Sequence, residues 1–250
     1  MLLLVLCAGV SVEIVRAEET TIAVAANFLN ASRALASAFE TATGHQVAIV
    51  SGSTGLLYAQ IINGAPIDLL LAADQERPRL LAEEGLGYPT SIVTYATGRL
   101  ALWSGQEGRI GENTLAELVD DDFRWFAIAE PEVAPYGTAA RQVLENLGVW
   151  RSIVPRMVKG QNVAQTFAMI ETSNAELGLV ALSQVLAYEG PASYQIVSAG
   201  LYDPIRQDAV LLQRAVENTA AREFLEFLKT PAALGIMASY GYSAPNQTDQ

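Results

Sequence analysis

The sequence contains very little cysteine and histidine, and each shortage excludes a class of site. Of its 250 residues, one is cysteine and one is histidine. Cys7 lies in an apolar N-terminal segment, so the rest of the chain has no thiol for a disulfide or a thiolate metal site. His45 follows Gly44 and precedes a predicted strand, so we expect it on a surface turn and without a catalytic or metal-binding role.

Positive charge is also scarce. The chain has 15 Lys and Arg against 27 Asp and Glu, which gives a net charge of −12. This balance argues against a nucleic-acid partner, because such a partner requires a basic face. An anionic ligand would be repelled at long range, so its binding would depend on local, preorganised dipoles.

The N-terminal segment has the pattern of an export signal. Residues 1–12 are almost wholly apolar, and Val15-Arg16-Ala17 supplies the small-x-small pattern of a signal-peptidase site. We therefore expect residues 1–17 to form a signal peptide that is cleaved after Ala17. The apolar run is too short to span a bilayer, and no other run in the sequence is long enough.

Short apolar strands alternate with helical segments along the rest of the chain, which predicts an α/β fold. The predicted strands are 20–25, 47–50, 69–72, 92–95, 100–103, 126–129, 177–180, 194–197 and 209–212. The predicted helices are 31–39, 56–62, 80–84, 138–147, 163–170, 182–187, 219–228 and one that begins at Pro231. No single linker is visible, as expected of a two-lobed protein whose chain crosses between lobes twice, near 100–103 and 202–210.

Four short segments read as a small polar turn that opens a helix. They are Ala25-Ala26-Asn27-Phe28, Gly52-Ser53-Thr54-Gly55, Ala134-Pro135-Tyr136-Gly137 and Gln161-Asn162-Val163-Ala164. None of them contains Lys or Arg. A helix start carries unpaired N–H donors and a partial positive charge, so four converging starts would form a neutral site for a small oxyanion. Each turn alone is equally compatible with an ordinary helix cap.

The sequence offers little for catalysis. A hydrolase that uses Ser53 would need a nearby base, but His45 is the only histidine and no G-x-S-x-G elbow is present. No spacing of His, Cys, Asp and Glu predicts a metal site. We therefore expect a binding protein with no catalytic residues, and the ligand-sensing half of a regulator is a further alternative.

Taken together, these motifs resemble those of the periplasmic molybdate-binding proteins that serve ABC transporters, from about Thr21 to Tyr242. The residues that carry the resemblance are Val24–Leu29, Ser51–Gly55, Tyr58–Pro66, Ala72–Asp74, Pro131, Ala134–Gly137, Val143-Leu144, Leu147-Gly148, Leu177-Gly178, Val180–Leu182 and Tyr240–Tyr242. The resemblance implies a type II periplasmic-binding-protein fold with two lobes, each a mixed, mostly parallel sheet flanked by helices, and two crossover strands as the hinge. It implies one lobe at 18–100 plus 203–250 and a second at 101–202.

The resemblance also implies a ligand and a site. The ligand would be molybdate or tungstate, with no cofactor, and the alternative is another tetrahedral oxyanion such as sulfate. The positions that match the family's binding residues are Asn27, Thr54, Tyr136 and Val163, with Ala26 and Ser53 beside them. The chain has Asn27 where many relatives have Ser, and Ala181 where many have Tyr. The implied protein is a periplasmic monomer that delivers its ligand to an ABC-transporter permease.

Overall fold

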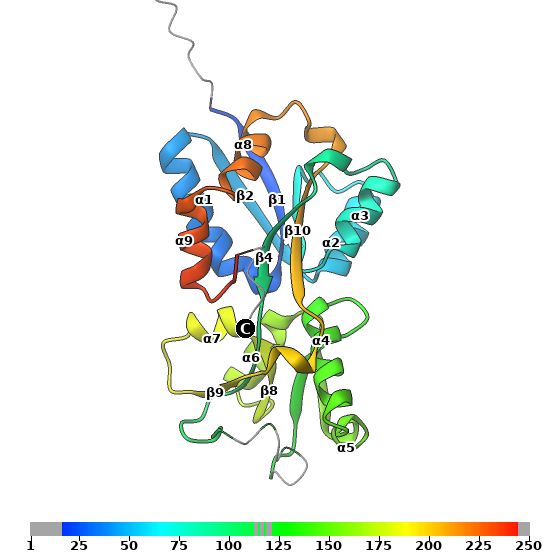
Figure 1. The fold of residues 1–250 in the computed structure, drawn as a ribbon, viewed down its shortest axis with the longest axis vertical. Coiled ribbons are helices and arrows are strands. Elements are labelled where there is room, and N and C mark those ends of the chain that lie inside the picture. Colours follow the sequence, from blue (N-terminus) through cyan, green and yellow to red (C-terminus); the bar gives the residue numbers. More distant parts are fainter. Residues whose placement is uncertain (1–16, 113–114, 116–117, 119–121, 245–250) are drawn as a thin grey trace, which may run out of the picture.

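The computed structural model describes residues 17–112, 115, 118 and 122–244, so the predicted signal peptide lies outside the described residues except for Ala17. The described chain forms two lobes that meet at a narrow waist (Figure 1). Each lobe is built on one five-stranded sheet. The two-lobed α/β architecture predicted from the sequence is therefore confirmed.

The sheet of the first lobe has the strand order β2-β1-β3-β10-β4. Its strands are β1 (Glu19–Ala25), β2 (Gln46–Gly52), β3 (Leu69–Leu71), β4 (Val93–Gly98) and β10 (Ile205–Leu211). The helices of this lobe are α1 (Leu29–Thr43), α2 (Thr54–Ile62), α3 (Glu76–Glu83), α8 (Thr219–Phe227) and α9 (Pro231–Ser239). Strand β1 is parallel to β2 and β3, whereas β10 is antiparallel to β3 and β4.

The sheet of the second lobe repeats this plan in the order β7-β6-β8-β5-β9. Its strands are β5 (Leu100–Ser104), β6 (Phe126–Ala129), β7 (Met157–Gly160), β8 (Leu177–Ala181) and β9 (Ser193–Ile196). Its helices are α4 (Pro135–Asn146), α5 (Trp150–Ile153), α6 (Val163–Glu171) and α7 (Leu182–Leu186). Strand β6 is parallel to β7 and β8, whereas β5 is antiparallel to β8 and β9.

Local sequence patterns explain most of these elements. Along α1, the buried Ala31, Leu35 and Phe39 recur at the spacing of one helix face, and Gly44 ends the helix in the left-handed region with a φ of 80°. Two predictions need correction. The short elements β7 and α5 were not predicted, and α3 begins at Glu76 rather than at Leu80. Its polar first turn shows no apolar periodicity, although the Pro78 that it contains is tolerated there.

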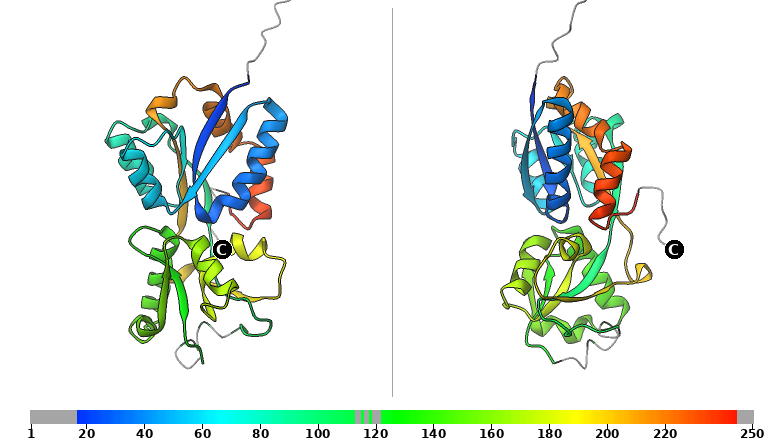
Figure 2. Two further views of the ribbon diagram at one scale, coloured as in Figure 1. Left: turned by 180° about the vertical axis from the view of Figure 1, so that it is seen from behind. Right: turned by 90° about the vertical axis from the view of Figure 1, so that its left-hand side faces the viewer.

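The topology brings the polar turns to the waist. Because β1, β2 and β3 are parallel, their carboxyl ends share one edge of the first sheet, and β6, β7 and β8 do the same in the second. In open α/β sheets, ligands bind at such edges. The chain passes between lobes at two places, from β4 to β5 and from β9 to β10 (Figures 1 and 2). Among the described residues, no helix is both long and apolar enough to cross a membrane.

Candidate functional site

A small cavity at the waist is lined by residues of both lobes. Its lining residues are Ala25, Ala26, Asn27, Ser53, Thr54, Ala73, Ala134, Pro135, Tyr136, Asn162 and Val163. All six of the sequence-predicted site residues are among them, so the structure brings together four turns that lie far apart in the sequence. The cavity volume is about 10 Å³, which is space on the scale of one water molecule and far too little for an organic solute.

The first lobe contributes two buried hydroxyl groups at the start of α2. The Thr54 Oγ1 accepts a hydrogen bond from the backbone N–H of Ala73 at 3.0 Å, which leaves the Thr54 hydroxyl proton available for donation. The Ser53 Oγ is buried and has no hydrogen-bond partner, and it does not cap the helix that it precedes. A buried hydroxyl without a partner is costly. Ser53 therefore retains its full hydrogen-bonding capacity for a ligand.

The second lobe contributes two helix starts. Helix α4 begins with Pro135, which has no N–H, so the first backbone donor of this helix is Tyr136. Helix α6 begins at Val163, and the Asn162 side chain accepts a hydrogen bond from Gln165 N in the first turn. That cap leaves the N–H of Val163 without an intrahelical partner. Both helix starts carry the partial positive charge of the helix dipole.

None of the side chains that line the cavity is charged. Asp74 carries a carboxylate and is the chain neighbour of the lining residue Ala73. It accepts a hydrogen bond from the N–H of Arg77 at 2.9 Å and lies 3.3 Å from the Arg77 guanidinium. Burial raises the pKa of Asp74, because desolvation disfavours the carboxylate. The electrostatics of the cavity are therefore set by backbone and hydroxyl dipoles.

A buried polar network lies behind Asn27 and joins the lobes. The Asn27 Nδ2 lies 3.0 Å from the Tyr242 hydroxyl, 3.1 Å from the Gln207 Oε1 and 3.5 Å from the Tyr136 hydroxyl. The Ser183 hydroxyl donates to the backbone carbonyl of Asn27 at 2.9 Å. Tyr136 and Ser183 belong to the second lobe and the other three residues to the first, so the network forms only where the lobes meet.

The sequence analysis did not predict this network or the role of Ala73. Gln207 is a fully buried amide that lies between Arg206 and Asp208 in its strand, so no local pattern of the sequence marks it as buried. Ala73 follows β3 at the same sheet edge as Asn27 and Thr54, so strand topology could have identified it. Ala181, where many relatives have Tyr, ends β8, is fully buried and does not line the cavity.

The prediction that His45 lies on a surface turn is wrong. The side chain is fully buried beside Phe39, its Nδ1 accepts a hydrogen bond from the N–H of Glu18, and its Nε2 lies 3.3 Å from the Glu223 carboxylate. His45 precedes β2, whereas Ser53 follows the same strand, so a strand of seven residues separates them by about 20 Å. His45 therefore cannot serve as a base for Ser53.

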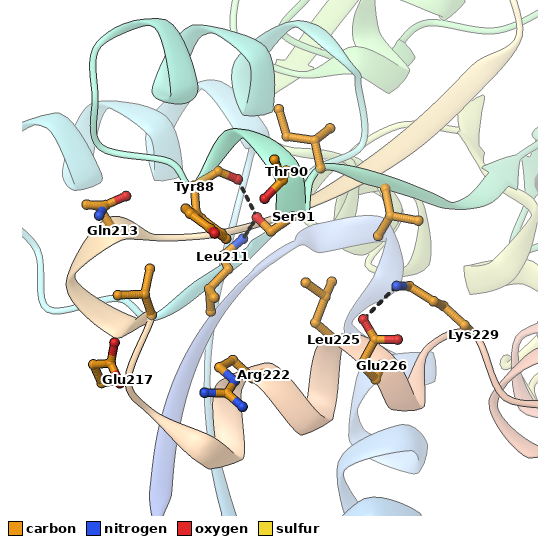
Figure 3. A pocket seen from close by; sticks show the side chains of 13 residues that line it. Tyr88, Thr90, Ser91, Leu211, Gln213, Glu217, Arg222, Leu225, Glu226 and Lys229 are labelled. Carbon is orange, nitrogen blue, oxygen red and sulfur yellow. Dashed lines mark hydrogen bonds and ion pairs between the residues drawn. The ribbon is translucent and has the colours of Figure 1, made fainter.

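A larger cavity lies entirely within the first lobe, between η2 (Pro89–Ser91) and α8 (Figure 3). Its volume is about 580 Å³. Its wall carries the carboxylates of Glu217 and Glu226, and Glu226 forms an ion pair with Lys229 at 2.6 Å. None of the four predicted turns lines it. Its size and mixed charge do not match the small oxyanion site that the turns predict.

Two sheets whose carboxyl-terminal edges enclose a cavity between lobes define a solute-binding protein of the periplasmic-binding class. Comparison with known families agrees: residues 20–243 match the family of bacterial extracellular solute-binding proteins. The molybdate-binding protein ModA of Rhodobacter capsulatus is 43% identical over 90% of this chain and 88% of that protein. The protein of the same name from Azotobacter vinelandii is 42% identical over 96% of both chains. The chain therefore belongs to the bacterial extracellular solute-binding proteins, and within them to the ModA family.

The fold is shared with a solved member of this family. The structure of the Azotobacter vinelandii periplasmic molybdate-binding protein superimposes with a TM-score of 0.86 and 37% identity, covering 91% of this chain and 100% of that one. The sulfate-binding protein SubI of Mycobacterium tuberculosis has a TM-score of 0.74 at 12% identity, which shows a common fold alone.

The buried tyrosines predict how stability depends on pH. Burial raises the pKa of Tyr95, Tyr136 and Tyr242, because a buried phenolate loses its hydration. In the unfolded chain these phenols ionise near pH ~10, so unfolding releases protons above that pH and the free energy of unfolding falls as pH rises. We expect the urea midpoint to decline above about pH 10. Ionisation of all nine tyrosines near their ordinary pKa in the folded protein, followed by ultraviolet absorbance, would contradict this.

Proposed function

We propose that this chain captures molybdate, and tungstate by the same geometry, through uncharged donors at the waist cavity. The observation that carries the proposal is the convergence of Ser53, Thr54, Tyr136 and Val163 on one small cavity that no charged side chain lines. Asn27 and Ala26 complete the first-lobe wall. The relatives named molybdate-binding proteins support the choice of ligand.

Uncharged donors are sufficient for tight binding. A hydrogen bond to an ionised partner contributes about 1.5–3 kcal/mol net. The Ser53 and Thr54 hydroxyls and the N–H groups of Tyr136 and Val163 would therefore together offset the desolvation of a dianion and the cost of closing the lobes. Because these donors are fixed by helix starts and buried turns, little further ordering is required when the anion enters.

A site made only of donors selects its ligand by protonation state and by size. Hydrogen phosphate has an O–H group that needs a hydrogen-bond acceptor. The cavity wall offers it mainly donors, so this O–H group would be left without a partner. Sulfate has no such proton and is discriminated by its shorter bonds, because the donors of two lobes cannot all reach a smaller anion at once. An amino acid would need a charged partner for each of its termini, and the lining residues supply none.

The protein would act outside the cytoplasm, in the periplasm, after removal of residues 1–17. We propose that the lobes, divided near 100/101 and 202/203, close on the anion as a monomer and that the closed form docks on the permease of an ABC transporter. Closure by the ligand requires contacts that are better in the closed form, and the Tyr136 and Val163 donors supply them. The net charge of −12 disfavours nucleic acid as a partner, and His45 is too distant from Ser53 to support catalysis.

Titration calorimetry of the purified mature chain tests this proposal. We expect molybdate and tungstate to bind with one ion per chain, and sulfate and phosphate to bind at least about 100-fold more weakly, since each donor that is lost or misplaced costs about 1.5–3 kcal/mol. Equal affinity for sulfate and molybdate would contradict size selection. Absence of heat with every oxyanion would contradict the proposed function as a whole.

Replacement of Ser53 separates ligand binding from stability. Because the Ser53 Oγ has no partner within the protein, Ser53→Ala should leave the urea midpoint unchanged or slightly raised, yet weaken molybdate binding by about 1–3 kcal/mol. Thr54→Val should weaken binding similarly and also lower stability, because the N–H of Ala73 loses its acceptor. Thr54→Ser keeps the hydroxyl and serves as the control. Wild-type affinity in Ser53→Ala would remove this residue from the site.

The neutral site also predicts that affinity does not depend on pH near neutrality. No lining side chain except the Tyr136 phenol can ionise, and burial raises its pKa well above the ordinary value. Molybdate affinity should therefore be constant from about pH 6 to about pH 9. A steady loss of affinity with rising pH would instead indicate that a cationic side chain holds the anion.

A further inference from the structure

The last residue of β4, Gly98, lies at the waist where no side chain fits. A Cβ at this position would lie 2.0 Å from the Tyr136 hydroxyl oxygen and 2.6 Å from the Gln207 Nε2. Gly98 is not among the glycines with positive φ, so its backbone conformation is open to any residue. The requirement for glycine therefore comes from the close approach of the Tyr136 and Gln207 side chains, of which Tyr136 is the nearer, and not from the backbone.

Tyr136 reaches Gly98 from the other lobe. Its hydroxyl accepts hydrogen bonds from the Asn27 Nδ2 at 3.5 Å and from the Gln207 Nε2 at 3.4 Å, and both of these donors belong to the first lobe. Tyr136 is only 2% exposed in this arrangement. The phenol is thus inserted into the first lobe, over the bare backbone of Gly98, while the N–H of the same residue opens α4 at the cavity.

A second glycine, Gly55, lies at another contact between the two lobes. The N–H of Gly55, in the first turn of α2, donates to the Val133 carbonyl of the second lobe at 3.0 Å. A Cβ on Gly55 would lie 3.0 Å from that carbonyl oxygen. At both places the lobes approach through backbone that carries no side chain, which allows the two sheet edges to come within reach of one small ion.

We propose that Gly98 is the residue that sets how far the lobes close, because its missing side chain lets the Tyr136 phenol dock on the first lobe and carry the Tyr136 N–H to the ligand. Gly98 does not line the cavity, so it is a positioning residue. The link from closure to affinity rests on the proposed function. A methyl group at Gly98 would stop closure before the second-lobe donors reach the anion, whereas the first-lobe donors would be untouched.

The test compares Gly98→Ala with a matched control. Gly235 lies in α9, has ordinary φ, and a Cβ there would meet no atom within 4 Å, so Gly235→Ala makes the same chemical change without the contact. In the mature chain, which has no cysteine, dyes at Glu83→Cys and Arg151→Cys place one label on each lobe for energy transfer. Molybdate dissociation is followed by stopped flow.

We expect molybdate to bring the labels together in the wild type and in Gly235→Ala, but not in Gly98→Ala. Loss of the two second-lobe N–H donors should raise the dissociation rate and Kd of Gly98→Ala by about 100-fold or more, with little change in the association rate. Adding Tyr136→Phe to Gly98→Ala removes the nearest of the clashing atoms and leaves the Gln207 Nε2 at 2.6 Å. Closure should therefore return in part, and Tyr136→Phe alone is the reference for this recovery. A merely structural role for Gly98 would not produce this rescue.

Several outcomes overturn the inference. Wild-type closure and wild-type affinity in Gly98→Ala would do so, as would a double variant that stays as open as Gly98→Ala. If Gly98→Ala fails to fold, recovery of folding and closure in the double variant supports the contact, and continued misfolding refutes it. If the wild type itself does not bind molybdate, the proposed function fails. The fraction of ligand-free molecules that show the short dye separation, expected to be lower in Gly98→Ala than in the wild type, then still decides the role of Gly98.

Discussion

The other features of the structure depend on buried hydrogen-bond donors at the waist that have no partner within the protein. Buried N–H and O–H groups are normally satisfied, because leaving one unpaired costs free energy. Here the Ser53 hydroxyl and the first donors of α4 and α6 line one small cavity from two lobes. The starts of α8 and α9 are capped by their own Asn218 and Thr230 side chains, and α6 is capped in the same way by Asn162. The starts of α2 and α4, which line the cavity, have no side-chain cap.

Because the chain is acidic, binding of an anion depends entirely on short-range contacts in the uncharged site. With a net charge of −12, the surface repels an approaching anion, and screening at physiological salt confines this repulsion to about 8 Å. Recognition must then act at contact distance, through dipoles that are strong only where water is excluded. The burial of Ser53, Thr54 and Tyr136 supplies that environment, and the Arg77 guanidinium offsets the charge of the Asp74 carboxylate beside it.

The sequence predicts those features that depend on neighbouring residues and does not predict those that depend on residues far apart in the chain. Strand, turn and helix start are local patterns, and four of them identified the cavity residues before any contact was known. The buried network around Gln207 and Tyr242 depends on partners about 180 and 215 positions from Asn27, and nothing local marks them. The prediction for His45 failed for a related reason, because its side chain contacts Glu223 of α8, which lies far away in the sequence.

The geometry of the network bears on the proposed closure of the lobes by a ligand. The two hydrogen bonds that the Tyr136 hydroxyl accepts across the waist are long, at 3.4 and 3.5 Å, and hydrogen bonds weaken as they lengthen beyond their usual range. They position the phenol without strongly stabilising the closed form. A binding protein that closed firmly when empty would exclude its solute, and one that did not close would lack its second-lobe donors. Weak contacts between the lobes, combined with strong donors aimed at the cavity, leave the anion as the component that decides between the two forms.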